Sequence, residues 1–452
     1  MRSSIKILLL TVLVFFFGVN VYAAEALMGK ERADITPVFL FPGFKDLKKY
    51  ARIENFRIGG KYDVGNEISY EFGGEGGVTL ESKGMPPLRV AYTAFGTPKK
   101  DSKGRITNAI VISPYFSADS TIFAALWHEG SPLLKVFAEG NAVTGANKIL
   151  DTNKYYVIYL DALGLWGASK PSDGLGPDFP KYNVYDVVQA NYRLLKDKIG
   201  VDQALLCTGV SMGAIQSYTM SMLHPHMCKG VMPIGGTLGG NDPVNNWSWA
   251  LFNAAVQSDP VFVKTGGKYY DLPVAEHPKK GLAFGWSIIS LTGWDFKATS
   301  DLPWKDAVKQ VFSWNDTDVF TGKVDPTVGA ARKAQVAKQD AQDFLYRVYG
   351  AENFDLFPYV KNIKAKMLVV HVNSDNWLIP ILAERSVDAI KKAGKDVKMS
   401  QFYDKQGHYG VFRAWNRAEK DIVPFLKSLG IEPGGVTAAA APAKAKPVGL
   451  SK

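Results

Sequence analysis

Residues 205–213 read Leu205-Leu206-Cys207-Thr208-Gly209-Val210-Ser211-Met212-Gly213, and they decide the fold of this 452-residue chain. An apolar run typical of a buried strand ends here in the pattern G-x-S-x-G, and a helix-like stretch follows it. The turn between such a strand and helix is so sharp that side chains at the two glycine positions would collide. We therefore predict that Ser211 is held in a strained conformation, exposed at the carboxyl end of a sheet.

The chain around this turn alternates short apolar runs with helical stretches, such as the helical spacing over residues 186–197. Near-continuous apolar strands that alternate with helices indicate a parallel sheet covered on both faces. Residues 56–98 differ, because their pattern predicts short antiparallel strands with glycine-rich turns. The predicted fold class is therefore α/β, with a mostly parallel central sheet. Its expected later strands are residues 108–115, 155–161, 204–210, 230–234, 367–372 and 397–403.

One long segment interrupts this alternation. Residues 236–357 show no strand pattern, read as helices and loops, and hold six of the ten tryptophans. We interpret them as a helical cap, or lid, inserted between two parts of the sheet domain, residues 25–235 and 358–433. The tryptophans either pack within this bundle or suit an apolar or aromatic group of a substrate. Residues 434–452 are rich in Ala, Pro and Lys, which predicts a disordered tail.

The N-terminus has the three-part pattern of a secretory signal peptide. Arg2 and Lys6 give a positive start, residues 7–17 form an apolar run, and Val21-Tyr22-Ala23 supplies small residues at the cleavage-determining positions. The run is about half of the roughly 20 residues that a membrane-spanning helix needs. We expect residues 1–24 to be cleaved, and the mature protein to be periplasmic or secreted, without stable membrane insertion.

Charge and cysteine content exclude several classes of protein. The net charge of +10 could suit a nucleic acid, but we find no arginine-rich run, zinc-finger spacing or RNP-like strand, so no nucleic-acid partner is expected. Two cysteines are too few for a disulfide-rich scaffold or a cysteine-rich metal site. Cys207 and Cys228 lie in or beside apolar predicted strands. Outside the cytoplasm a disulfide and two buried thiols are both open alternatives.

A serine hydroxyl is a weak nucleophile that needs a base, and the base needs an orienting acid. His408 follows the last predicted strand, where the base is expected. Asp375 follows the strand at 367–372, where the acid is expected. The three residues then occur in the order Ser, Asp, His. We predict the catalytic triad Ser211, Asp375 and His408.

Acyl transfer also needs N–H donors for the oxyanion that forms on attack. The backbone N–H of Met212, directly after the serine, is one expected donor. The other should come from the loop after the strand that begins at residue 108, which reads Ser-Pro-Tyr-Phe-Ser from Ser113. Pro114 has no N–H, so Tyr115 is the first choice and Phe116 the second.

No cofactor or metal site is expected. His224 and His226 flank a proline but lack a third ligand at a sensible spacing, and we find no P-loop or dinucleotide fingerprint. The glycine-rich stretch 235–240 follows a late strand and is expected to let the chain turn into the cap. His371 lies inside a predicted strand and is expected to pack in the core.

Nine segments together carry a resemblance to a known family: 79–84, 90–96, 179–180, 186–188, 211–213, 259–260, 266–270, 374–380 and 407–408. They resemble the homoserine O-acetyltransferase family, and they run in the same order over most of the chain, from about residue 79 to 425. The resemblance implies an α/β-hydrolase core, a helical lid over the site, and ping-pong acyl transfer through an acyl-serine. The triad that it implies is the one predicted above.

The departures from that family bear on the substrate. Tyr409 replaces an aspartate that helps to hold the substrate's amino group, and Asn253 replaces a cap arginine associated with substrate binding. We name Tyr409 and Asn253 as candidate substrate-binding residues. Losing both charges removes the obvious means of holding a zwitterionic amino acid. Predicted export also separates the protein from cytoplasmic acetyl-CoA, so homoserine is not the expected acceptor. Smaller departures are Ala214 for a glycine and a different oxyanion loop.

Three functions stay open on the sequence alone. The first is an exported serine hydrolase that cleaves small-molecule carboxylic esters through an acyl-serine. The second is an O-acyltransferase that passes the acyl group to an alcohol. The third is a binding protein with a vestigial site, against which the complete triad speaks. A homodimer is one possible assembly.

Overall fold

The computed structural model describes strands at residues 51–55, 61–64 and 68–71, and then residues 89–435 except 132, 166, 180, 241–242, 313–335 and 337–338. The predicted signal peptide lies outside the described residues, as does the predicted tail from residue 436 onward.

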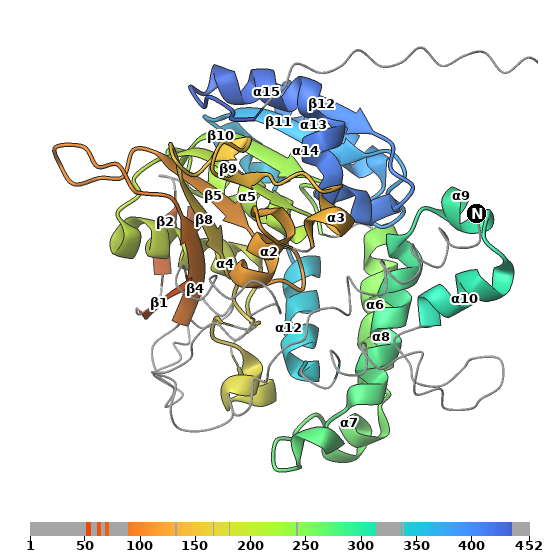
Figure 1. Cartoon of the computed structure of the whole chain (residues 1–452). Helices are drawn as coiled ribbons and strands as arrows, with labels where there is room; N and C mark the ends of the chain where they lie inside the picture. The colour runs from red at the N-terminus through yellow and green to blue at the C-terminus, as the bar shows by residue number, and fades with distance from the viewer. Residues whose placement is uncertain are drawn as a thin grey trace, which may run out of the picture.

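A single eight-stranded sheet organises the described chain (Figure 1). β1 and β4 pair antiparallel, as do β4 and β8, and every later pair is parallel. The prediction of a mostly parallel sheet is thus confirmed, and each expected later strand overlaps one observed strand. In sheet order the strands are β1 (Ala51–Asn55), β4 (Arg89–Phe95), β8 (Tyr156–Leu160), β5 (Ala109–Ser113), β9 (Ala204–Val210), β10 (Cys228–Ile234), β11 (Lys366–Val372) and β12 (Val397–Phe402).

The predicted antiparallel region at 56–98 is only partly described. It contains β4 and a separate antiparallel pair, β2 (Lys61–Val64) with β3 (Ile68–Glu71). A second small pair was not predicted: β6 (Thr144–Gly145) and β7 (Leu150–Asp151) run parallel. Two-residue strands carry too little alternation to be read from a sequence.

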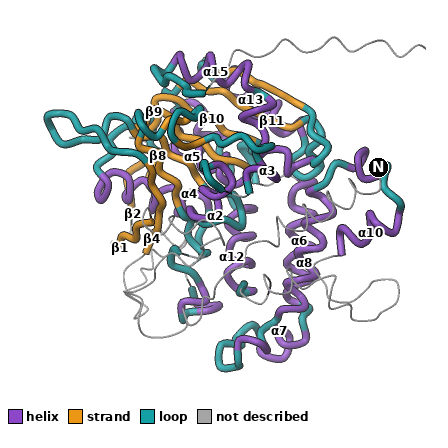
Figure 2. The backbone as a smooth tube through the Cα atoms, viewed as in Figure 1, coloured by secondary structure: helices purple, strands orange, loops and turns teal. Residues whose placement is uncertain are grey.

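Helices cover both faces of the sheet, as predicted (Figure 2). Side chains of β5 show the two faces, because Ala109 and Val111 pack into one buried cluster while Ile110 and Ile112 pack into the other. On the first face lie α4 (Val184–Arg193), a π-helical turn η6 (Leu194–Ile199), α5 (Met212–Leu223), η8 (Phe357–Asn362) and α13 (Pro380–Lys392). On the second lie α2 (Ser120–Trp127), α3 (Leu134–Phe137), η9 (Gly407–Arg413), α14 (Ala414–Arg417) and α15 (Glu419–Ser428).

Capping explains where the predicted helix at 186–197 begins. The side chain of Asn183 accepts the N–H of Tyr185, and the side chain of Asp186 accepts the N–H of Asn183. This capping box places the first helical residue at Val184, two positions before the prediction. The π-helical turn that follows ends at Gly200, whose φ of 90° suits a glycine.

The segment between β10 and β11 is built of helices (Figure 1). Its start and end lie side by side, because Leu356 N–H donates to Leu238 O at 2.8 Å and Gly240 N–H donates to Phe354 O at 3.0 Å. No strand of a sheet lies within its described residues. We call these the inserted helices: α6 (Pro243–Gln257), α7 (Pro260–Thr265), η7 (Val274–Glu276), α8 (Lys279–Gly293), α9 (Phe296–Ser300), α10 (Trp304–Phe312) and α12 (Ala341–Glu352).

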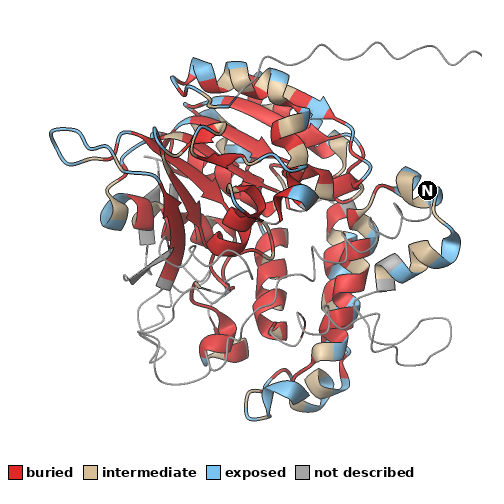
Figure 3. Cartoon of the chain, in the orientation of Figure 1, coloured by how far each residue is buried: buried red, intermediate tan, exposed pale blue. Residues whose placement is uncertain are grey.

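The inserted helices have an aromatic core of their own. Phe252, Trp286 and Phe344 are buried there, and the same cluster includes Phe116 and Met212 from the sheet domain. α6 and α8 pack along their length. Figure 3 shows the sheet and α12 as mostly buried, whereas α7, α9 and α10 are mostly exposed or half-buried. None of the helices described in this structure is long and apolar enough to cross a membrane.

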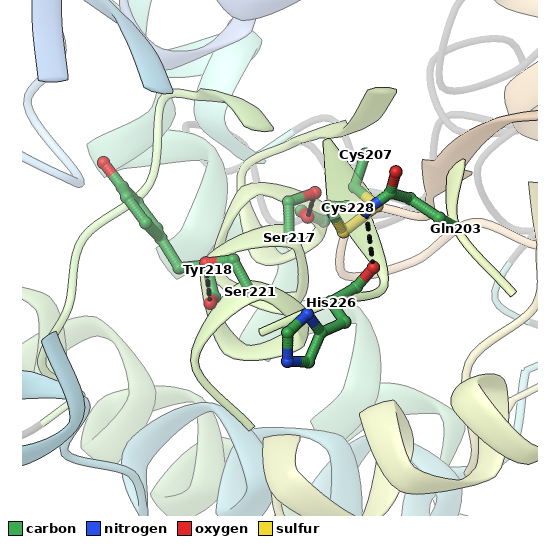
Figure 4. The surroundings of a disulfide bond; sticks show 8 residues. Gln203, Cys207, Ser217, Tyr218, Ser221, His226 and Cys228 are labelled. Carbon is green, nitrogen blue, oxygen red and sulfur yellow. Dashed lines mark hydrogen bonds between the residues drawn. A yellow bond between two sulfur atoms is a disulfide. The ribbon is translucent and has the colours of Figure 1, made fainter. Parts of the chain in front are cut away.

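Cys207 and Cys228 form a disulfide between β9 and β10, which the sequence had left open (Figure 4). Their Cα atoms are 5.8 Å apart, within the usual range for a disulfide, and both residues are buried. The bridge therefore joins two neighbouring parallel strands four residues before Ser211.

Candidate active site

Ser211 stands at the turn between β9 and α5. Its φ is 56° and its ψ −121°, a backbone conformation that residues other than glycine rarely adopt. Only two other non-glycine residues among those described have a positive φ. The Ser211 N–H donates to Ile234 O of the neighbouring strand at 2.9 Å, which holds the strained residue in place. The prediction of a strained serine at the carboxyl end of the sheet matches this geometry.

The two glycines of G-x-S-x-G are required by backbone contact. A Cβ atom on Gly209 would lie 2.6 Å from the carbonyl carbon of Gly213 and 2.7 Å from Ser113 O. A Cβ on Gly213 would lie 2.2 Å from the same Ser113 oxygen. Real Cβ contacts are never so short, so the turn and the loop after β5 can approach each other only with glycine at both positions.

Ser211, His408 and Asp375 form a hydrogen-bonded chain. His408 Nε2 is 2.9 Å from Ser211 Oγ, and His408 Nδ1 is 2.6 Å from Asp375 Oδ2. Asp375 lies in the loop after β11, and His408 lies in η9 after β12. The structure thus brings together three residues that are up to 197 positions apart, at the carboxyl end of the parallel strands.

Burial and backbone donors fix this chain. Asp375 and His408 are buried, while Ser211 is half-buried. The second oxygen of Asp375 accepts the N–H groups of Trp377 and Leu378, each at 2.9 Å. The carboxylate therefore has acceptor bonds on both oxygens, which sets its orientation toward the imidazole.

The loop Ser113–Ser117, which we call the β5 loop, runs beside the start of α5. Gln216 of α5 donates from Nε2 to Pro114 O at 2.9 Å. Met212 and Gly213 are the first two residues of α5. The first N–H of this helix that donates to a carbonyl of the turn is that of Ala214, which donates to Ser211 O. The Met212 N–H therefore belongs to the first turn, where helix amides have no partner within the helix. The β5 loop follows β5, and Met212 follows β9, which is the neighbouring strand in the sheet. The predicted donors Tyr115 and Met212 therefore lie after the ends of two adjacent strands.

The two candidate loop donors, Tyr115 and Phe116, have side chains that leave in different directions. Tyr115 packs edge-on against Phe123 and Phe412, and burial raises the pKa of its hydroxyl above the usual range. Phe116 packs against Trp249 of α6, with ring centroids 4.6 Å apart. Because the two side chains are anchored in separate clusters, the backbone between them has little freedom to rotate.

An aromatic row beside His408 was not predicted. Trp377 contacts the His408 ring at 5.0 Å between centroids and contacts Trp249 at the same distance. The indole N–H groups of Trp249 and Trp377 are buried and have no hydrogen-bond partner in the part of the chain that the structure describes. In the sequence Trp377 stands two residues after the predicted acid, but nothing in the pattern showed that it faces α6.

Of the two predicted substrate-binding residues, Tyr409 adjoins the Ser–His–Asp chain, because its ring lies edge-on to that of His408 with centroids 6.5 Å apart, whereas Asn253 lies on α6. The Tyr409 ring packs against Trp294, 5.1 Å between centroids, and against Gly293 at the end of α8. Asn253 is half-buried on α6, and its Oδ1 is buried without a partner.

Two further histidines, His371 and His224, are buried and pack inside the molecule. His371 is fully buried in β11, and its Nε2 is 2.8 Å from Leu378 O; burial lowers its pKa. His224 stacks on Tyr192 at 3.5 Å and lies 3.0 Å from Gln189 Oε1; burial lowers its pKa to about 3. Within the described ranges no group of three potential metal ligands is gathered.

Comparisons with known proteins agree with this architecture. No family model matches the chain. A homoserine O-acetyltransferase of Methanohalobium evestigatum is 29% identical over 355 residues, covering 73% of this chain and 67% of the relative. The structure of homoserine O-acetyltransferase from Bacillus anthracis is 20% identical with a TM-score of 0.63, and covers 83% of this chain and 97% of its own.

The chain has the α/β-hydrolase fold. A structure of an acetylester hydrolase from Corynebacterium glutamicum shares it, at 19% identity and a TM-score of 0.61, covering 84% of this chain and 95% of its own. The chain is an enzyme of this fold that has homoserine O-acetyltransferases as homologues and esterases among its structural neighbours.

Proposed function

We propose that the protein is an exported serine hydrolase that cleaves carboxylic esters through an acyl-serine intermediate. The observation that carries the proposal is the hydrogen-bonded chain from Asp375 through His408 to Ser211 at a strained turn. A nucleophile, a base within 2.9 Å and an acid that orients the base are the three parts that acyl transfer needs.

The reaction proceeds in two halves. Ser211 Oγ attacks the ester carbonyl while its proton passes to His408 Nε2, and Asp375 stabilises the resulting imidazolium. The N–H groups of Met212 and Tyr115 bind the oxyanion of the tetrahedral intermediate. The intermediate collapses, and the leaving alcohol takes the proton from His408. Water, deprotonated by His408, then attacks the acyl carbon, releases the carboxylic acid and restores Ser211.

A second candidate is an O-acyltransferase, in which an alcohol replaces water in the second half. Two observations favour keeping it: the curated homologue is named a homoserine O-acetyltransferase, and the inserted helices share a buried core with Met212 of the site. We propose that these helices act as a lid. A lid that excludes water and admits an alcohol would favour transfer over hydrolysis.

The neutral residues Tyr409 and Asn253, which stand where the resembling family has charged residues, argue against an amino-acid acceptor. Tyr409 packs against the end of α8, and Asn253 offers an amide where a zwitterion would need a cation. The aromatic row formed by Phe116, Trp249 and Trp377 instead suits an apolar or aromatic acyl or alcohol group. The proposed substrates are therefore small esters without a free amino-acid head group.

Export, to the periplasm or outside the cell, is part of the proposal. The Cys207–Cys228 disulfide supports it, because stable disulfides belong to oxidising compartments. Removing residues 1–24 from an expression gene should abolish export of the protein. Edman sequencing of the exported protein should find a new N-terminus at Ala24 or Glu25, from cleavage after Ala23 or Ala24. An exported protein that begins at Met1 would contradict the signal-peptide assignment.

We further propose a homodimer that forms through the outer face of α6 and α8. Trp247 and Leu251 of α6 and Leu291 of α8 are each more than half exposed. Apolar side chains gathered on exposed helices mark interaction surfaces. Light scattering should give twice the chain mass, and Trp247→Lys should halve it. A monomeric wild-type protein would contradict the dimer.

The experiment that tests the proposed function is release of p-nitrophenol from p-nitrophenyl acetate in water, with Ser211→Ala as control. Steady turnover that vanishes in the variant supports hydrolysis. A single stoichiometric burst that then stalls supports the transferase, because the acyl-enzyme waits for an alcohol. No Ser211-dependent release would count against both functions for this acyl group.

A further inference from the structure

Arg347 is a buried cation that points at the backbone of the candidate site. It lies on α12, at the end of the inserted helices, and is fully buried. Its Nε and one terminal nitrogen donate to Phe116 O at 3.2 and 3.0 Å. Its other terminal nitrogen donates to Leu163 O at 3.1 Å. One guanidinium therefore holds two backbone carbonyls from different loops.

Burying a full charge at this depth costs free energy, so packing alone does not explain an arginine at this position. Desolvation lowers the pKa of Arg347, while the neighbouring Tyr182 and Asp161 act in the opposite direction. A guanidinium remains charged in such surroundings, since its ordinary pKa lies above 12. A leucine or methionine would fill the space at α12 without this cost, but could not bind a carbonyl.

The contacts of Arg347 and Gln216 flank Tyr115, the first-choice oxyanion donor. Gln216 binds the carbonyl of Pro114, which shares a rigid peptide plane with the Tyr115 N–H. Arg347 binds the carbonyl of Phe116, the next residue along. Tyr115 O also accepts the N–H of Ala118 at 3.2 Å, which closes a turn. With the carbonyls on both sides held, the Tyr115 backbone cannot rotate freely.

We propose that Arg347 is a positioning residue of the oxyanion hole, which fixes the β5 loop so that the Tyr115 N–H stays aligned with Ser211. The inference rests on the proposed function, because it assigns a role within the acyl-transfer step. It also connects the inserted helices to the chemistry by hydrogen bonds, whereas the other contact of α12 with the loop, between the Phe344 and Phe116 rings at 5.8 Å, is apolar.

The test compares Arg347→Met and Arg347→Lys with the matched control Tyr346→Phe. Tyr346 is the preceding residue of α12, and its hydroxyl donates to Pro177 O and Phe179 O, carbonyls of a different loop. All three variants thus lose buried ties between α12 and a backbone. For each we would measure the melting temperature, kcat and KM with p-nitrophenyl acetate, and the inhibition constant of phenylboronic acid.

Phenylboronic acid forms a tetrahedral adduct on a reactive serine, and so reports on the oxyanion hole in the absence of turnover. For Arg347→Met we expect kcat to fall about ten- to a hundredfold, KM to stay within about twofold, and the inhibition constant to rise in parallel with the loss of kcat. Arg347→Lys should fall between, since one ammonium cannot serve both carbonyls. Tyr346→Phe should lower the melting temperature but keep kcat and boronate affinity.

Wild-type kcat and boronate affinity in a folded Arg347→Met protein would overturn the inference, as would equal losses in Tyr346→Phe. If Arg347→Met does not fold, Arg347→Lys decides, because it keeps the charge: wild-type kcat there overturns the role of the forked contact. Failure of the proposed function is separate, since it would appear first as wild-type turnover that does not depend on Ser211.

Discussion

The two sides of the candidate site are held by different means. The turn around Ser211 is shaped by steric contact with backbone atoms, within the turn itself and with Ser113 O, which requires glycine at Gly209 and Gly213. The β5 loop is instead held by side chains from far along the chain, Gln216 and Arg347, which are 102 and 231 residues away from their carbonyl partners. Positions that must be glycine can be recognised in a short sequence motif. A hydrogen bond from a distant side chain produces no local sequence pattern.

The largest expected effect lies on the side of the Ser211 turn. Asp375→Asn should lower kcat about 10⁴-fold, because an amide favours the wrong histidine tautomer and cannot stabilise the imidazolium. Steady-state kinetics with p-nitrophenyl acetate would measure it, with Asp388→Asn on the exposed face of α13 as control. A loss of less than about tenfold would remove Asp375 from the proposed triad.

The contact between the two sides gives the next effect. In Gly213→Ala the new Cβ would lie 2.2 Å from Ser113 O, so the turn and the β5 loop must separate. We expect kcat to fall about 10²- to 10³-fold, as when an oxyanion donor is lost. The free energy of unfolding should fall by about 1–3 kcal/mol.

Gly350→Ala serves as its control, because a Cβ there would meet its nearest neighbour, Tyr182 O, at 3.4 Å. It should keep kcat. A Gly213→Ala protein with wild-type kcat would mean that the close approach of Ser113 and Gly213 has no part in catalysis.

Removing the disulfide should lower the stability of the protein without changing the geometry of the turn around Ser211. Replacing both Cys207 and Cys228 by serine should lower the free energy of unfolding by about 3 kcal/mol, from the loss of a 21-residue constraint on the unfolded chain. Because glycine sterics shape the turn, kcat of the folded variant should stay within about twofold. Urea titration and kinetics at low temperature would measure the two effects, and a large fall in kcat with unchanged stability would contradict this division.

Substitutions that loosen the β5 loop should have a smaller effect, and should lower kcat without changing KM. Gln216→Met removes the donor to Pro114 O but keeps the volume, so kcat should fall about tenfold with KM nearly unchanged. Ser217→Ala is the matched control, because the Ser217 hydroxyl donates to Gly213 O within α5 itself. A loss confined to KM would mean that Gln216 acts on substrate binding instead.

The smallest effect concerns the acidic group where the β5 loop passes into α2. Burial, and then the charge of Asp161, raises the pKa of Asp119 to about 7. Folding therefore binds a proton between the pKa of the unfolded chain, about 3.9, and about 7. The stability that this proton gives is present below that range, and is lost as pH rises through it.

Asp119→Asn mimics the protonated acid and keeps the helix cap. The free energy of unfolding of the wild type, relative to this variant, should therefore fall from pH 5 to pH 8. Urea titrations at unit steps of pH would measure the difference. A difference independent of pH would contradict a raised pKa at Asp119.

The same contrast explains what the sequence could predict. The strands, the strained Ser211 and the loops that carry Asp375 and His408 follow from apolar runs and from residue types at strand ends, so they were predicted. Arg347 lies in an ordinary helical pattern, and nothing local distinguishes an arginine that faces Phe116 O from one that faces solvent. Tertiary contacts of this kind need the folded structure.

The central claim is that Ser211 carries the acyl group. The most direct measurement is mass spectrometry of protein quenched in acid soon after mixing with p-nitrophenyl acetate, followed by peptide mapping. The account predicts one acetyl group, on the peptide that contains Ser211, and none in Ser211→Ala. Acetylation of a different residue, or turnover by Ser211→Ala at the wild-type rate, would contradict it.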